Sequence, residues 1–165
     1  MSRVLSIFFG VGLLRPAPGT WGSAVAVILG LLIDRYLGVF ALLAATVAII
    51  ALGFWACERE LRDRPGADPG EIVIDEVAGQ WIALLFPAFA FWNRGMEDWA
   101  FTAYPGWVAA FVFFRLFDIW KPWLVGRADR RDDPAGVMLD DLWAGVFAGL
   151  AVMAAAGVAH GILLR

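Results

Sequence analysis

The stretch RLFDIWKPWLVGRADRRDDPAGVMLDD, residues 115–141, separates two strongly apolar segments and decides how the rest of the chain is interpreted. Within it, Arg115, Asp118 and Lys121 are spaced by three, so on a helix they lie within about 120° of one another. Pro122 follows directly and discourages continuation of that helix. The pattern therefore predicts a helix that ends with two basic side chains and one acid on the same side.

Two pairs of adjacent acids mark the starts of apolar runs. Asp140 and Asp141 stand just before the run at residues 142–164, and Asp75 and Glu76 stand just before residues 77–92. One interpretation is ordinary helix capping, because negative charge is favourable at a helix N-terminus. The other is a binding site, because several carboxylates can hold a hard divalent cation while an Arg and a Lys hold phosphate.

The composition of the chain indicates a membrane protein. Its 165 residues leave room for one domain, residues 1–165. Hydrophobic residues make up 61% of the chain, aromatic residues 15%, and the mean hydropathy is +0.73, which is too apolar for a soluble domain of this size. The net charge of -3 comes without a basic block, so nucleic acid is not expected as a partner. The lipid bilayer is the expected surrounding.

The apolar segments predict an all-α, polytopic helical bundle with about five spans. Residues 4–14 are too short to cross a hydrocarbon core about 30 Å thick, so they predict a short N-terminal helix that lies at the interface or re-enters. The Pro- and Gly-rich residues 15–23 and 65–70 predict a loop and a turn. The first span is expected to be short or tilted. The expected spans are residues 24–33, 38–56, 77–92, 100–116 and 142–164.

Counting these crossings places the N-terminal region and the joints at residues 58–75 and 121–141 on one face. Nine Lys or Arg residues belong to that face and three to the other, with Arg115 at the border. The positive-inside bias therefore predicts that this face is cytoplasmic. The nine are Arg3, Arg15, Arg59, Arg62, Arg64, Lys121, Arg127, Arg130 and Arg131, and the three are Arg35, Arg94 and Arg165.

The same count brings the acid pairs together with the basic pair and indicates a chemistry. Four converging carboxylates would repel one another, and a divalent cation would relieve that repulsion. Ligands that are all oxygens favour Mg²⁺, Mn²⁺ or Ca²⁺ over zinc, for which the chain has one Cys and one His. A cysteine phosphatase is excluded because Asp63 occupies the Arg position of the C-x5-R pattern after Cys57. Metal-assisted transfer or hydrolysis of a phosphate ester fits best.

Glycines supply two further hypotheses. The segment PGTWGS could present backbone N–H groups and the hydroxyls of Thr20 and Ser23 to a phosphate at a helix N-terminus, although a simple turn and cap would explain it equally well. The spacings Gly145-x3-Gly149 and Gly157-x3-Gly161 are typical of close helix packing in membranes.

Four segments, GLLRPAPGTWGS, IVIDEVAGQW, FRLFDIWKPW and GVMLDDLWAG, closely resemble in this order the phosphatidylglycerophosphatase A family of bacterial membrane lipid phosphatases. The resemblance runs from about residue 10 to residue 149 and departs from many relatives at Leu124, where they have a second Pro. It implies a multi-pass enzyme of the bacterial inner membrane with its active site towards the cytoplasm. The implied reaction is Mg²⁺-dependent conversion of phosphatidylglycerophosphate into phosphatidylglycerol and inorganic phosphate.

The resemblance matches individual positions to the family's motifs, and the chemistry of these side chains suggests a role for each. The acid pairs match the family's DE and DD motifs and are candidate metal ligands, while Thr20 and Ser23 of the glycine-rich loop are candidate phosphate ligands. Arg115 and Lys121 would bind phosphate and stabilise the transition state, and Asp118 would orient a cation, bind metal or activate water. Attack on phosphorus by a carboxylate and attack by metal-activated water both remain open. The candidate residues are Thr20, Ser23, Asp75, Glu76, Arg115, Asp118, Lys121, Asp140 and Asp141.

Two alternatives come from other classes of protein. An ion or solute transporter subunit would use the carboxylates as an ion path, but such acids are expected near the middle of a span rather than beside a basic pair at its end. A non-catalytic scaffold for lipid-synthesis enzymes would need neither a metal nor the second acid pair.

Overall fold

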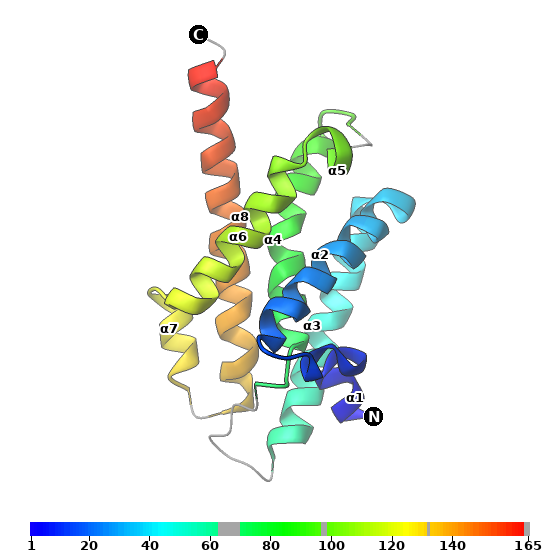
Figure 1. The fold of residues 1–165 in the computed structure, drawn as a ribbon, viewed down its shortest axis with the longest axis vertical. Helices are drawn as coiled ribbons and strands as arrows, with labels where there is room; N and C mark the ends of the chain where they lie inside the picture. Colours follow the sequence, from blue (N-terminus) through cyan, green and yellow to red (C-terminus); the bar gives the residue numbers. More distant parts are fainter. Residues whose placement is uncertain (63–69, 97–98, 132, 164–165) are drawn as a thin grey trace.

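The computed structural model describes residues 1–62, 70–96, 99–131 and 133–163. The structure is 84% helical and has no strand among these described residues, which confirms the predicted all-α bundle (Figure 1). The described helices are α1 (Ser2–Ser6), the 3₁₀ helix η1 (Phe8–Leu13), α2 (Pro18–Leu37), α3 (Val39–Leu61), α4 (Ile74–Trp92), α5 (Trp99–Thr102), α6 (Pro105–Trp120), α7 (Leu124–Asp129) and α8 (Pro134–Leu163).

Four of the described helices, α2, α3, α4 and α8, are long and apolar enough to cross a membrane. The fifth expected span corresponds to α6, whose 16 residues give a length of about 24 Å, less than the roughly 30 Å of a hydrocarbon core. Figure 1 shows α6 running obliquely across the bundle, and it packs on α4 and α8. By length and composition the described part therefore has four spans, with α6 as a shorter, inclined fifth helix.

The central element is α4. It packs against α2, α3, α6 and α8, and most of its side chains are buried. The indole Nε1 of Trp81 donates a hydrogen bond to the carbonyl of Ala26 at 2.8 Å, which ties α4 to α2. Burial on nearly all sides explains why residues 77–92, which follow the acid pair, are apolar except for Gln80. Pro87 lies inside this helix without ending it.

Two helix starts differ from the sequence-based expectation. The prediction that residues 15–23 form a loop is wrong for residues 18–23, because α2 already begins at Pro18. Proline is favourable at the first helical position. Likewise α8 begins at Pro134 rather than at residue 142. Its start is capped by Asp133, whose Oδ1 accepts the backbone N–H of Gly136 at 2.8 Å. The predicted first span was therefore too short, and so was the last.

The N-terminal segment closes one end of the bundle. The backbone N–H of Val73 donates to the carbonyl of Ser6 at 2.9 Å, and Arg3 forms an ion pair with Glu71 at 3.0 Å. In Figure 1 this end, at the bottom of the view, also holds the end of α3, the start of α4, α7 and the start of α8. The structure thus gathers the segments that the crossing count placed on one face. Most of the expected turn at residues 65–70 lies outside the described residues, as do Arg64 and Arg165.

Candidate active site

The first pair of acids lies in the first turn of α4. Asp75 is 7% exposed, and its Oδ1 accepts the backbone N–H of Glu76 at 3.0 Å. Glu76 follows as the third residue of the helix, and its Oε2 is buried without a hydrogen-bond partner among the described residues. The positive end of the helix dipole favours negative charge here. That dipole does not supply the missing hydrogen bond, so a buried carboxylate oxygen is left available to a ligand.

The second pair of acids lies in the second turn of α8, not at its start. Asp140 and Asp141 are 8% and 3% exposed, and Asp140 Oδ1 accepts the backbone N–H of Asp141 at 2.9 Å. Because Asp133 caps the helix, these two acids have no capping role. The capping interpretation is therefore wrong for this pair, and its burial needs another explanation.

Glycines bring α8 close enough to α4 for the two pairs to meet. A Cβ on Gly79 would overlap the backbone carbonyl of Asp141, and a Cβ on Gly145 would overlap the carbonyl of Gly79. A Cβ on Gly149 would overlap the ring of Phe86. The Gly145-x3-Gly149 spacing thus serves close packing within this chain. A Cβ on Gly157 or Gly161 would meet no described atom within 4 Å.

This close approach creates a cluster of three carboxylates. Oxygen atoms of Asp75, Glu76 and Asp141 all lie within 4.8 Å of one another, an arrangement that could hold a metal ion. We call these three residues the acidic cluster. Asp140, the fourth predicted ligand, is not part of it, because its Oδ2 pairs with Lys121 Nζ at 3.1 Å. The structure therefore divides the four predicted ligands into a group of three and one that is held by a lysine.

The cation Arg115 lies beside the acidic cluster. Its Nη1 forms an ion pair with Asp118 Oδ2 at 2.6 Å and lies 3.4 Å from Ser23 Oγ. A Cβ on Gly19 would overlap Glu76 Oε1 and would come within 3.2 Å of Arg115 Nη1, so the first turn of α2 lies against both groups. The Nε of Arg115 is buried without a hydrogen-bond partner among the described residues.

The candidate phosphate ligands on α2 have different surroundings. Ser23 is fully buried, and its hydroxyl donates to the carbonyl of Gly19 at 2.8 Å, one turn earlier in the helix. Thr20 is exposed. The structure therefore brings Ser23 to Arg115 as predicted, but as a residue inside a helix rather than as a loop or cap residue. Gly19 was not among the predicted site residues, although its missing Cβ is what allows α2 to approach Glu76.

Lys121 occupies a separate position at the end of α6. It adopts a left-handed backbone conformation, with φ of 51°, immediately before Pro122. Its Nζ bonds to both Asp129 of α7 and Asp140 of α8. Partial burial opposes the charge of Lys121, but the hydrogen bonds and charges of Asp129 and Asp140 outweigh it and raise the pKa of this lysine above its ordinary value. Asp129 was not predicted, because it lies on α7, a short helix that the sequence pattern did not indicate.

Comparisons with known proteins identify the family of this chain. The family model described as phosphatidylglycerophosphatase A matches residues 4–156. The chain belongs to the phosphatidylglycerophosphatase A family. It is therefore a phosphatase, and the transporter and scaffold alternatives are set aside. No solved structure matches the chain.

Three relatives show how closely the family is matched. A phosphatidylglycerophosphatase A of Haemophilus influenzae is 36% identical, with 92% of this chain and 86% of the relative covered. The Escherichia coli phosphatidylglycerophosphatase A is 35% identical, with 87% of this chain and 77% of the relative covered. A Bacteroides thetaiotaomicron protein, whose name gives phosphatidylinositol-3-phosphatase as its proposed activity, is 36% identical over 89% of this chain and 88% of its own length.

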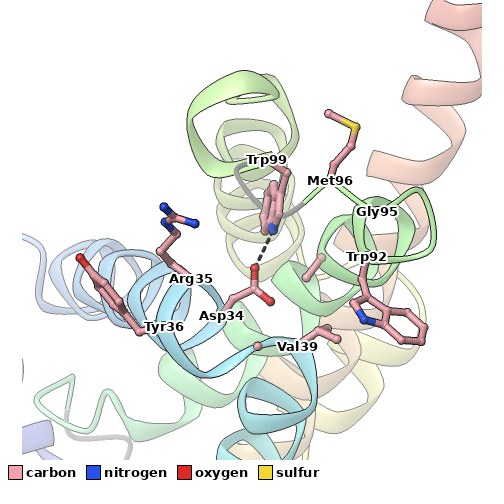
Figure 2. A pocket seen from close by; sticks show the side chains of 10 residues that line it. Asp34, Arg35, Tyr36, Val39, Trp92, Gly95, Met96 and Trp99 are labelled. Carbon is pink, nitrogen blue, oxygen red and sulfur yellow. Dashed lines mark hydrogen bonds between the residues drawn. The ribbon is translucent and has the colours of Figure 1, made fainter.

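A cavity at the opposite end of the bundle is separate from the acidic cluster. It has a volume of about 340 Å³ and is lined by residues at the ends of α2 and α4, including Asp34 and Trp92 (Figure 2). Figure 2 shows Trp99 donating its indole N–H to Asp34 Oδ2, at 2.6 Å. Trp92 lies seventeen positions after Asp75 on helix α4, which corresponds to a distance of about 26 Å. This hydrogen bond joins α5 to α2 far from the candidate active site.

Proposed function

We propose that this protein hydrolyses the terminal phosphate monoester of phosphatidylglycerophosphate in an Mg²⁺-dependent reaction, giving phosphatidylglycerol and inorganic phosphate for phospholipid biosynthesis. The observation that carries the proposal is the acidic cluster beside Arg115, at one end of a membrane bundle that belongs to this family. A phosphate monoester carries two negative charges, and the site offers a place for a divalent cation next to a guanidinium group.

The acidic cluster fits a hard divalent cation. Asp75, Glu76 and Asp141 supply carboxylate oxygens only, which are the ligands that Mg²⁺ prefers. The unpartnered, buried Glu76 Oε2 is the kind of atom that a metal or its water would satisfy. When bound, Mg²⁺ would offset the charge of the phosphoryl group and orient it for attack.

Arg115 is the residue that we assign to phosphate binding. Asp118 and Ser23 hold its Nη1 from two sides, which restricts the plane of the guanidinium group. The buried Nε remains without a described partner and can donate to a phosphate oxygen. Asp118 acts in this proposal by orienting Arg115. Breakage of the ester bond then leaves the glycerol oxygen on the lipid, while water supplies the new oxygen of inorganic phosphate.

Lys121 is assigned to the entrance of the site. Its side chain is 31% exposed, and carboxylates of α7 and α8 hold its ammonium group at the position where a headgroup would enter. Lysine is protonated at neutral pH at its ordinary pKa of about 10.4, and the raised pKa of Lys121 keeps the same charge. Trp120 and Trp123 flank it and are 69% and 87% exposed. Exposed tryptophans are favoured at the membrane–water interface, which supports entry of the headgroup there while the acyl chains stay in the bilayer.

The proposal includes the location of the enzyme. A single domain of residues 1–165 would lie in the bacterial inner membrane as a multi-pass protein. The nine-to-three distribution of Lys and Arg supports a site that faces the cytoplasm.

Phosphate release by the purified protein tests the function. The substrates are phosphatidylglycerophosphate, phosphatidylinositol 3-phosphate and phosphatidic acid in mixed micelles, each with Mg²⁺ and with EDTA. We expect release from phosphatidylglycerophosphate with Mg²⁺ to exceed that from the other two lipids by about tenfold or more. Faster phosphate release from phosphatidylinositol 3-phosphate would contradict the proposed substrate and favour the activity named for the Bacteroides relative. Equal rates of phosphate release with Mg²⁺ and with EDTA would contradict the proposed need for a metal.

A further inference from the structure

Gln80 is the most unusual polar residue outside the candidate set. It lies in α4, its side chain is 0% exposed, and neither its Nε2 nor its Oε1 has a hydrogen-bond partner among the described residues. Burying an amide without a partner costs about 1–3 kcal/mol. An apolar side chain of similar volume would avoid that cost, so the amide needs an explanation beyond packing.

The direction of Gln80 follows from its neighbours on the helix. Gly79 faces Asp141 of α8 and Phe114 of α6, and Trp81 faces Ala26 of α2. Successive residues of a helix point about 100° apart, so Gln80 points into the sector between these two directions. Glu76 lies four residues earlier and therefore on the same face, with its Cβ about 6 Å away.

Other unpartnered polar atoms belong to the acidic cluster and to the arginine beside it. Besides the two atoms of Gln80, the buried side-chain atoms without a described partner are Glu76 Oε2 and Arg115 Nε. Arg115 Nη1 and Glu76 Oε1 both lie beside Gly19, so α4 and α6 present these groups to each other. The set contains both donors and acceptors, as a chain of hydrogen bonds through bound water requires.

We propose that Gln80 is a positioning residue for the acidic cluster, whose amide binds an ordered water that hydrogen-bonds Glu76 Oε2 and fixes the direction of the Glu76 carboxylate. The inference rests on the proposed function, because it assigns Glu76 to the reacting centre. Gln80 touches neither substrate nor metal in this account. Its effect is on the geometry of Glu76, and a displacement of about 1 Å at such a group can lower a rate roughly a hundredfold.

The test replaces the amide without changing the volume. Gln80→Met keeps the length of the side chain and removes both polar atoms. We expect kcat to fall about tenfold or more while KM changes less than about threefold, because lipid binding is retained. The thermal midpoint in detergent, measured without metal, should change little, because the amide binds water rather than another part of the fold. Gln80→Asn, which keeps a displaced amide, should retain more activity than Gln80→Met.

Thr46→Val is the matched control. Thr46 is 2% exposed on α3, and its hydroxyl donates to the carbonyl of Leu42 at 2.7 Å. This variant should lose a little stability and keep its activity per folded protein.

Three results would overturn the inference. Full activity of Gln80→Met removes Gln80 from the site while leaving the proposed function intact. A Gln80→Met protein that unfolds, or that loses stability and activity together, shows that the amide has a structural partner. A wild-type protein that releases no phosphate from phosphatidylglycerophosphate refutes the proposed function itself, and the positioning role falls with it.

Discussion

Asp141→Asn separates a role in the reaction from a role in the fold. Asp141 is 3% exposed, and its carboxylate lies within 4.8 Å of those of Asp75 and Glu76. Two ionised carboxylates at that distance repel by roughly 3 kcal/mol at an effective dielectric constant of about 20. The substitution keeps the shape of the side chain and removes one of the three carboxylates that repel one another. Without metal, the free energy of unfolding should therefore stay the same or increase.

The turnover of Asp141→Asn should fall, although its stability does not. Loss of a carboxylate from the acidic cluster should lower phosphate release by roughly a hundredfold or more, equivalent to about 2.7 kcal/mol of activation free energy. The assay is the initial rate at saturating Mg²⁺, normalised to folded protein measured by size-exclusion chromatography in detergent. A fully active Asp141→Asn protein would refute the reasoning.

Asp133→Asn is the matched control for this experiment. It is the same substitution near the start of the same helix, but Asp133 caps α8 through the N–H of Gly136. Asparagine caps about as well as aspartate, so stability and turnover should both stay near those of the wild type. Asp133→Ala should cost about 1 kcal/mol of stability and leave turnover per folded molecule unchanged.

Further predictions concern the metal, the helix contact and the topology. EDTA should abolish turnover, and Mg²⁺ or Mn²⁺ should restore it better than zinc does; full turnover of metal-stripped protein would contradict this. Gly79→Ala should lower stability by about 1–3 kcal/mol and also reduce turnover, because its Cβ would force α8 and Asp141 away from α4. Gly157→Ala, whose Cβ meets no described atom, should leave turnover unchanged and keep or slightly raise stability. In a background without Cys57, cysteines introduced at Arg62 and Arg130 should be labelled from the same side of the membrane, and labelling from opposite sides would contradict the common face.

Local patterns in the sequence were sufficient for much of this architecture. The apolar runs predicted the positions of α3 and α4, and Pro122 marked the end of α6. The spacing of Arg115 and Asp118 predicted a shared helix side, and the structure joins them in an ion pair. These features depend on neighbours in sequence, so periodicity and proline chemistry were enough to find them.

The features that were missed depend on contacts between distant segments. The predicted start of α8 was too late in the sequence, because the prediction placed Asp140 and Asp141 at the helix start. Asp133 before Pro134 is itself a capping signal. The division of the four acids into a cluster of three and a Lys121 partner follows from how α7 packs on α8, which no local pattern encodes. Gln80 was not singled out, because the sequence does not show that its side chain is fully buried; that burial follows from the packing of the folded bundle.

The central claim is that the acidic cluster removes the terminal phosphate from a lipid with two phosphate groups. Following phosphatidylglycerophosphate by ³¹P NMR measures this directly, because the monoester, the diester and inorganic phosphate give separate signals. With wild-type protein and Mg²⁺, the monoester signal should disappear and inorganic phosphate should replace it one for one while the diester signal persists, and Asp141→Asn should leave the spectrum nearly unchanged. A persistent monoester signal with the wild type, loss of the diester signal, or equal conversion by Asp141→Asn would contradict the account.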